Sequence, residues 1–124
     1  MYIDTNILMR YLLNDIPEQA SRAAEIIADS AQIYPEVIPE AVYVLFKIYG
    51  IPRKAVANTL IAVLDEISVE RKEHIRKALK LFGETKLDYI DCLHLAGYSF
   101  SGDDFFSFDR KLINKKKTLA SDNS

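Results

Sequence analysis

The sequence predicts an α/β fold in which a short central parallel sheet is flanked by helices, as in an α/β/α sandwich. The first observation is that "MYI" at residues 1–3 is typical of a short buried strand, and a helical pattern follows it at once. The second is that short strand-like stretches alternate with amphipathic helical segments along the chain. Alternation of this kind is typical of a parallel sheet that is covered on both faces.

The expected elements follow one another without repeats, low-complexity tracts or linkers. In order they are a strand over residues 1–3, helices over 5–14 and 17–30, a short strand near Ile33 or near Val37 and Ile38, helices over 39–50 and 51–67, a short strand over 67–69, helices over 70–84 and 87–100, a strand over 104–109 and a helix over 110–117. The chain of 124 residues is long enough for one domain with a hydrophobic core. The basic tail from about residue 115 is a candidate for mobility.

Helix ends and faces support these assignments. Thr5 or Asn6 stands near the first N-cap, Pro17 and Pro39 occupy favoured first-turn positions, and Gly50 follows the end of its helix. The inward positions expected for the two central helices are Val42, Leu45, Phe46 and Tyr49, then Val56, Leu60, Val63 and Leu64. Segment 87–100 is apolar on most sides, whereas the aromatic run "FFSF" ending at residue 108 favours a strand.

Composition excludes several classes of protein. No apolar run reaches the roughly 18 residues of a membrane span, and the start lacks a charged signal-like region. The net charge of −2 argues against a protein that coats nucleic acid through its overall positive charge, although the segment "RKLINKKK" is strongly basic. Cys92 is the single cysteine, which rules out a disulfide within the chain and favours a reducing compartment such as the cytoplasm.

Four acids stand where an unpaired carboxylate is costly. Asp4 and Asp109 end predicted strands, Glu40 lies in the first turn of an apolar helix, and Asp91 lies within a helix that is apolar on most sides. Asp4 and Asp109 could instead be helix N-caps, and Glu40 an acid favoured by the helix dipole. Asp91 is too far into its helix to be a cap. In such sheets, sites form at the carboxyl ends of parallel strands, where Asp4 and Asp109 are expected. Glu40 and Asp91 are expected on buried helix faces, so all four acids are candidate site residues.

Divalent cations would offset the several kcal/mol that burying unpaired carboxylates costs. Ligands that are all oxygen point to Mg²⁺ or Mn²⁺. Zinc does not suit the chain, because His74, His94 and Cys92 lack any ligand spacing.

The segments "YIDTNIL", "IPEAVYVLFK", "LDYIDCLHLA" and "FFSFDRKL" together resemble those of a PIN-domain ribonuclease, and the likeness is greatest to the VapC-type toxins of toxin–antitoxin pairs. The segments follow in family order over residues 1 to about 113. The resemblance implies an Mg²⁺- or Mn²⁺-dependent endoribonuclease with a PIN-like fold. Its metal-binding acids would be Asp4, Glu40, Asp91 and Asp109.

Further roles follow from the same resemblance. Thr5 and Asn6 would orient Asp4, and Ser107 stands where the family often has threonine. Asp88, three residues before Asp91, would be a helix cap or an accessory acid. Asp103 and Asp104 are expected to be loop residues, although they could compete for metal.

Several basic residues are candidates for the RNA backbone, where contacts would be sensitive to salt. They are Arg10, Lys111, Lys115, Lys116 and Lys117. By resemblance the expected partners are an RNA substrate, a second copy of the chain and a small antitoxin protein. Val44, Ile48, Ile61 and Ala62 could form the dimer interface or belong to a thick single core.

Two other functions compete with this one. The first is a catalytically inactive PIN-like module that binds RNA or protein, which a missing acid would favour. The second is a HAD-like phosphohydrolase, which requires an acid two residues after its nucleophile, where this chain has Asn6.

Overall fold

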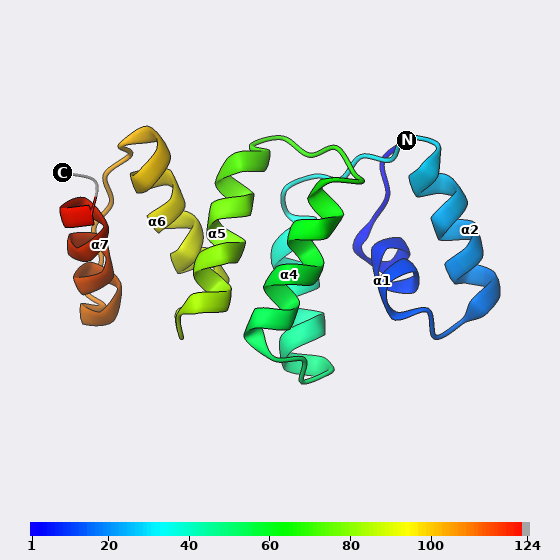
Figure 1. The fold of residues 1–124 in the computed structure, drawn as a ribbon, viewed down its shortest axis with the longest axis horizontal. Helices are drawn as coiled ribbons and strands as arrows, with labels where there is room; N and C mark the ends of the chain where they lie inside the picture. The colour runs from blue at the N-terminus through cyan, green and yellow to red at the C-terminus, as the bar shows by residue number, and fades with distance from the viewer. Residues whose placement is uncertain (123–124) are drawn as a thin grey trace.

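The computed structural model describes residues 1–122, with side chains described for residues 1–120, and helices dominate this part of the chain (Figure 1). The helices are α1 (Thr5–Leu13), α2 (Pro17–Ala28), α3 (Val37–Tyr43), the π-helical turn η1 (Val44–Ile48), α4 (Arg53–Leu64), α5 (Lys72–Glu84), α6 (Tyr89–Ser101) and α7 (Arg110–Asp122). Each predicted helix is present, and α3 begins before Pro39 because a first-turn proline needs no amide hydrogen.

The predicted central parallel sheet is wrong for residues 1–122, which contain only isolated bridges. Tyr2 pairs with Gln32, and Gln32 pairs with Ser68, both in parallel. The Ile3 amide donates to the Gln32 carbonyl at 2.9 Å, and the Ile33 amide donates to the Ser68 carbonyl at 3.0 Å. Each extended stretch has a single bridge residue, which is below the usual length of a strand. Neighbouring stretches therefore share a single bridge each within residues 1–122, where a ladder was expected, and Gln32 takes part in both bridges.

The strand predicted over residues 104–109 is also wrong, because this segment forms an irregular connection between α6 and α7. Phe106 and Phe108 are 78% and 93% exposed, so neither ring is packed as the aromatic pattern suggested. The alternative strand near Val37 and Ile38 is likewise wrong, since both residues lie in α3. β propensity describes a fit to a half-buried surface, and these segments have no such partner.

The helices stand side by side in a row, with α2 at one end and α7 at the other, and the α3–η1 helix lies behind α4 (Figure 1). One hydrophobic core runs from Ile3 and Leu8 near one end to Leu112 and Leu119 near the other. Helices α4 and α5 approach closely at Gly83, where an added Cβ would lie 2.9 Å from that of Ala57. Val56, Leu60, Val63 and Leu64 are buried, as their spacing predicted.

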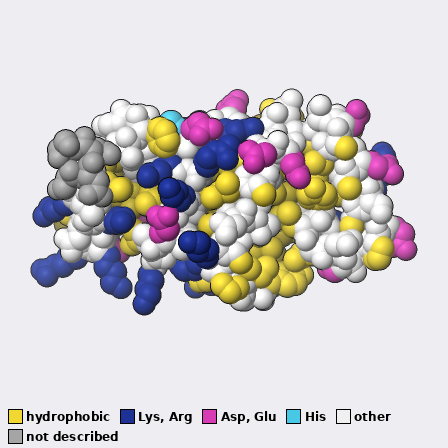
Figure 2. Space-filling model, in the orientation of Figure 1, with side chains coloured by type: hydrophobic (Ala, Val, Ile, Leu, Met, Phe, Trp, Pro, Cys, Tyr) yellow, Lys and Arg dark blue, Asp and Glu magenta, His cyan; other side chains and the backbone are white. Residues whose placement is uncertain are grey.

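Charged side chains are distributed unevenly over the face drawn in Figure 2. Lys and Arg gather mainly over the half that contains α5–α7, and Asp and Glu are more frequent towards α1 and α2. No helix within residues 1–122 is long and apolar enough to cross a membrane. The predicted basic tail falls in α7, which continues through Asp122; its last residues, 123–124, lie outside the described part of the chain.

Candidate functional site

Asp4 lies at the junction between the first extended segment and α1. Its backbone is extended (φ −93°, ψ 177°), and its Oδ1 accepts a hydrogen bond of 3.0 Å from the Ile7 amide, so Asp4 caps the helix. The side chain is exposed, and its Oδ2 has no hydrogen-bond partner within the described residues. A capping role therefore fixes one oxygen and leaves the other available to a ligand.

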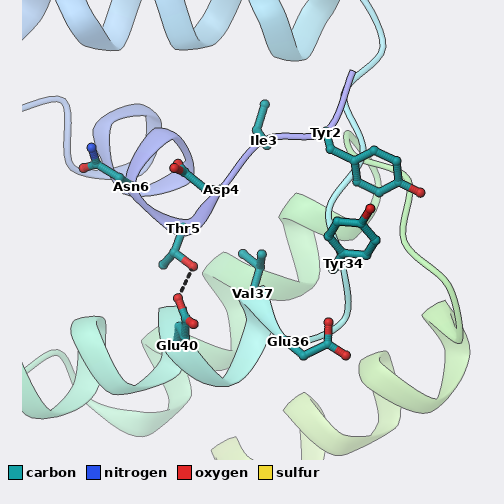
Figure 3. Close-up of a pocket in the computed structure, with 9 residues that line it drawn as sticks. All are labelled: Tyr2, Ile3, Asp4, Thr5, Asn6, Tyr34, Glu36, Val37 and Glu40. Atoms are coloured by element: carbon teal, nitrogen blue, oxygen red, sulfur yellow. Dashed lines mark hydrogen bonds between the residues drawn. The ribbon is translucent and has the colours of Figure 1, made fainter.

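Thr5 connects Asp4 to Glu40, an acid 35 residues away. The Thr5 hydroxyl donates a hydrogen bond of 2.5 Å to Oε2 of Glu40, which joins the first turn of α1 to α3 (Figure 3). Thr5 thus holds Glu40, whereas the family resemblance implied that it would orient Asp4. The amide of Asn6 points away from Asp4 in the same view.

Asp4 and Glu40 line one cavity of about 460 Å³. Its other lining residues are Tyr2, Ile3, Thr5, Asn6, Tyr34, Glu36 and Val37 (Figure 3). The Tyr2 and Tyr34 rings stack with centroids 4.3 Å apart and planes 12° from parallel. Sequence reasoning missed Tyr2, Tyr34 and Glu36. No local pattern marks them, because they come together only when Tyr2 pairs with Gln32.

Asp91 lies in the first turn of α6 and does not line this cavity. Partial burial raises the pKa of its carboxyl above the usual range, and the negative charges of Asp88 and Asp109 raise it further. These three acids therefore form a second group, held near one another by α6 and the start of α7. Asp88 occupies the N-cap position of α6, but its side chain makes no capping hydrogen bond.

Asp109 caps α7. Its Oδ1 accepts hydrogen bonds from the amides of Lys111 at 2.9 Å and Leu112 at 3.2 Å. The Ser107 hydroxyl oxygen in turn accepts a hydrogen bond of 3.0 Å from the Asp109 amide. Ser107 therefore stabilises the turn that presents Asp109.

The candidate RNA-binding residues differ in what they contact. Arg10 Nη1 donates to both carboxylate oxygens of Asp15, at 2.9 and 3.0 Å. Lys116 pairs with Asp104 and donates to the Phe105 carbonyl at 2.8 Å.

The three remaining candidates, Lys111, Lys115 and Lys117, form no salt bridge within the described residues. Asp103 lines a different cavity, beside His94. Neither Asp103 nor Asp104 joins the acids of the candidate site.

The four predicted acids thus fall into two sets, and no group of three or more potential ligands surrounds one point within the described residues. Asp4 and Glu40 share a cavity, and Asp91 and Asp109 interact electrostatically. The donor chemistry suits a hard divalent cation, because every candidate ligand is a carboxylate oxygen. However, neither the pair of Asp4 and Glu40 nor the pair of Asp91 and Asp109 provides a complete set of metal ligands by itself.

Comparison with known proteins gives one match. The family model of the PIN domain matches residues 1–117. No curated protein and no solved structure matches the chain. Because the family model covers nearly the whole chain and PIN domains are generally metal-dependent nucleases, a nuclease-type hydrolase is indicated. The chain belongs to the PIN-domain family.

Proposed function

We propose that the protein is an Mg²⁺- or Mn²⁺-dependent endoribonuclease, acting as the toxin of a type II toxin–antitoxin pair. The observation that carries the proposal is that Asp4, the N-cap of α1, and Glu40 of α3 line one cavity in a chain matched by the PIN family model over residues 1–117. Hydrolysis of a phosphodiester needs an activated water and compensation of charge on the phosphate.

Asp4, Glu40, Asp91 and Asp109 are the residues that would hold the metal. A bound divalent cation lowers the pKa of a water molecule and neutralises phosphate charge. Since these acids lie in two sets within the described residues, ligation by all four requires α1 and α3 on one side and α6 and α7 on the other to move closer.

The residues around the acids would hold them in place for catalysis. The Ile7 amide orients Asp4 through Oδ1, and the Thr5 hydroxyl orients Glu40. The raised pKa of Asp91 reflects burial and repulsion from Asp88 and Asp109, and a cation would relieve that repulsion. These contacts support a role in catalysis beyond helix capping.

The substrate we propose is RNA, held through its backbone by basic residues near α7. Lys111 and Lys117 are exposed and Lys115 is half-buried. Arg10 and Lys116 are weaker candidates, because each already pairs with a carboxylate. Binding through the free lysines should weaken as salt concentration rises.

The protein would act with two protein partners in a reducing compartment. The cavity with Asp4, Glu36 and Glu40 is acidic, so it suits a basic side chain of a small antitoxin protein. Exposed Ile48 and half-buried Val44 and Ile61 support a homodimer interface, while Ala62 is exposed. The lone Cys92 supports a reducing compartment such as the cytoplasm.

The test is cleavage of a fluorescent RNA with Mg²⁺, Mn²⁺ or EDTA by the wild type and by Asp4→Asn. Asparagine caps helices as well as aspartate does, so this change removes the charge and keeps α1 capped. We expect cleavage only with metal and a loss of at least about a hundredfold in Asp4→Asn, because the cation that positions the reacting groups loses a charged ligand. Asp29→Asn, on an exposed carboxylate at the end of α2, is the control. Equal cleavage in EDTA would contradict the proposal.

A second candidate function is a PIN-like module that binds RNA without cleaving it. The separation of the acids into two sets favours it. RNA binding without cleavage in any metal, together with no metal-induced rise in melting temperature, would support this alternative.

A further inference from the structure

Another cavity, of about 320 Å³, lies between the α3–η1 helix and the start of α6 and is also lined by Arg53 of α4 and Phe82 of α5. Its lining combines an exposed aromatic ring with three cationic side chains: Tyr43, Lys47, Arg53 and Lys86 are among its residues. We infer that this cavity, called here the Tyr43 groove, binds unpaired bases of single-stranded RNA and their phosphates. The inference rests on the proposed function, because it places the substrate next to the acids.

The aromatic part of the Tyr43 groove is well suited to base stacking. Tyr43 is 59% exposed, and Ile90 across the groove is 51% exposed, so both present apolar surface to solvent. Phe46 and the buried Phe82 form its floor and pack edge to face with centroids 5.5 Å apart. Stacking on an aromatic side chain tolerates any base, because every base has a π face.

Arg53 keeps this floor in place and adds positive charge. Its guanidinium lies 3.9 Å from the centroid of the Phe82 ring, and its Nε donates to the Phe82 carbonyl at 2.9 Å. A second nitrogen of Arg53 donates to the Leu87 carbonyl. Since these bonds fix the guanidinium, we assign phosphate binding to the two lysines and a supporting role to Arg53.

Lys47 and Lys86 are both exposed, and neither forms a salt bridge within the described residues. Asp88 is the single acid among the residues that line the groove. The excess of positive charge favours a phosphate chain over an apolar peptide or a second copy of this chain. The cavity of Asp4 has the opposite charge, with three acids.

The groove leads to the candidate catalytic acids along two helices. Tyr43 lies three residues after Glu40 and four before Lys47, so the three side chains share one face of the α3–η1 helix. On α6, Asp88 lines the groove and lies three residues before Asp91. An RNA strand whose base stacks on Tyr43 therefore continues towards Glu40 in one direction and towards Lys47 in the other. Bases in a helical stem are already stacked, so the groove selects unpaired RNA.

The test is the affinity for a fluorescein-labelled oligouridylate of about eight nucleotides, measured by anisotropy in EDTA so that cleavage does not interfere. We expect Tyr43→Ala to weaken binding about tenfold, whereas Tyr43→Phe, which retains the ring, stays within about twofold. The pair Lys47→Ala and Lys86→Ala should weaken binding and reduce the slope of log affinity against log salt by about 1.4. All variants should keep the wild-type circular dichroism spectrum, because the substituted side chains are exposed.

Matched controls come from another cavity and another tyrosine. Lys54 and Lys80 line a cavity that also holds Glu84 and no aromatic ring, and Tyr49 is 50% exposed outside the groove. The pair Lys54→Ala and Lys80→Ala, and separately Tyr49→Ala, should leave the affinity within about twofold. Equal effects of the two lysine pairs would overturn the inference, since bulk charge alone would then explain binding.

The remaining outcomes separate the groove from the proposed function. Wild-type affinity in Tyr43→Ala, absence of RNA binding by the wild type, or a change of oligomeric mass in Tyr43→Ala each overturns the groove. Binding with the expected pattern but no cleavage in Mn²⁺ supports the groove and contradicts the nuclease. If the wild type cleaves RNA but Tyr43→Ala binds it with unchanged affinity, the nuclease is supported and the groove is contradicted.

Discussion

At the scale of single residues, the acids of this chain serve a local purpose in addition to the proposed chemistry. Asp4 and Asp109 each cap a helix through one carboxylate oxygen, as the simpler interpretation of the sequence held. A cap orients its carboxylate by a backbone amide, and that orientation is also what a ligand of a metal or substrate requires. The two interpretations are therefore compatible in physical terms.

Thr5 offers a test of this positioning role. Thr5→Val removes the hydroxyl that holds Glu40 at 2.5 Å while keeping the shape of the side chain. We expect the melting temperature to fall by only a few degrees, since one partly exposed hydrogen bond contributes about 1 kcal/mol. Cleavage should fall about tenfold in kcat, because Glu40 loses its orientation. Thr5→Ser, which keeps the hydroxyl, should restore kcat to within about twofold; equal losses in both variants would assign Thr5 a purely structural role.

Sequence reasoning located the acids but not their neighbours in the cavity. Asp4, Glu40, Asp91 and Asp109 drew attention because a charge among apolar residues stands out in a single sequence. Tyr2, Tyr34 and Glu36 did not, because two tyrosines and a surface acid are ordinary until folding stacks the rings 4.3 Å apart. Contacts between distant segments carry no local signal.

At the scale of elements, helices could be predicted and strands could not. The 3.6-residue periodicity and the prolines at 17 and 39 fix helices from local information alone. A strand requires a partner that is distant in sequence. The aromatic run before Asp109 has the composition of a strand but no partner within the described residues, so Phe106 and Phe108 remain exposed.

Arg53 at the start of α4 links that helix to α5 and to the connection between α5 and α6. It donates to the carbonyls of Phe82 and Leu87 and stacks on the Phe82 ring. Arg53→Met keeps much of the packing but leaves two partly buried carbonyls without their donors. We expect a loss of about 2 kcal/mol in the free energy of unfolding, measured as a lower urea midpoint. Lys54→Met, one position along on the exposed side of α4, should change the midpoint little. A loss below about 0.5 kcal/mol in Arg53→Met would show that Arg53 acts only as a surface charge.

At the scale of the whole molecule, the family match predicts a central sheet that the described residues do not form. The PIN model matches residues 1–117, while the described residues form a row of helices with two isolated bridges in place of the expected sheet. The row places Asp4 with Glu40 in one cavity and Asp91 with Asp88 and Asp109 in a second group. Alternation along the sequence predicted the helices, but it could not determine how extended segments far apart would pair.

This separation makes a prediction about Asp91 in the metal-free protein. Burial, Asp88 and Asp109 raise the pKa of the Asp91 carboxyl, so folding disfavours its ionised form. In EDTA near pH 7, Asp91→Asn should therefore be more stable than the wild type. The advantage should shrink as pH falls through the raised pKa of the folded state. It should vanish below 3.8, the ordinary pKa of an aspartate, where the wild-type carboxyl is protonated in both states.

Metal should reverse that order of stability. A cation that binds only the folded wild type adds about 2.7 kcal/mol at a hundred times its dissociation constant, a rise of about 10 °C in melting temperature for a chain of this size. Asp91→Asn loses a ligand and should gain far less. Melting curves in EDTA and in millimolar Mn²⁺ measure both effects on the same samples, with Asp29→Asn as the control that should follow the wild type in each. If Mn²⁺ stabilises Asp91→Asn as much as the wild type, Asp91 does not hold the metal, and the second group of acids is no part of that site.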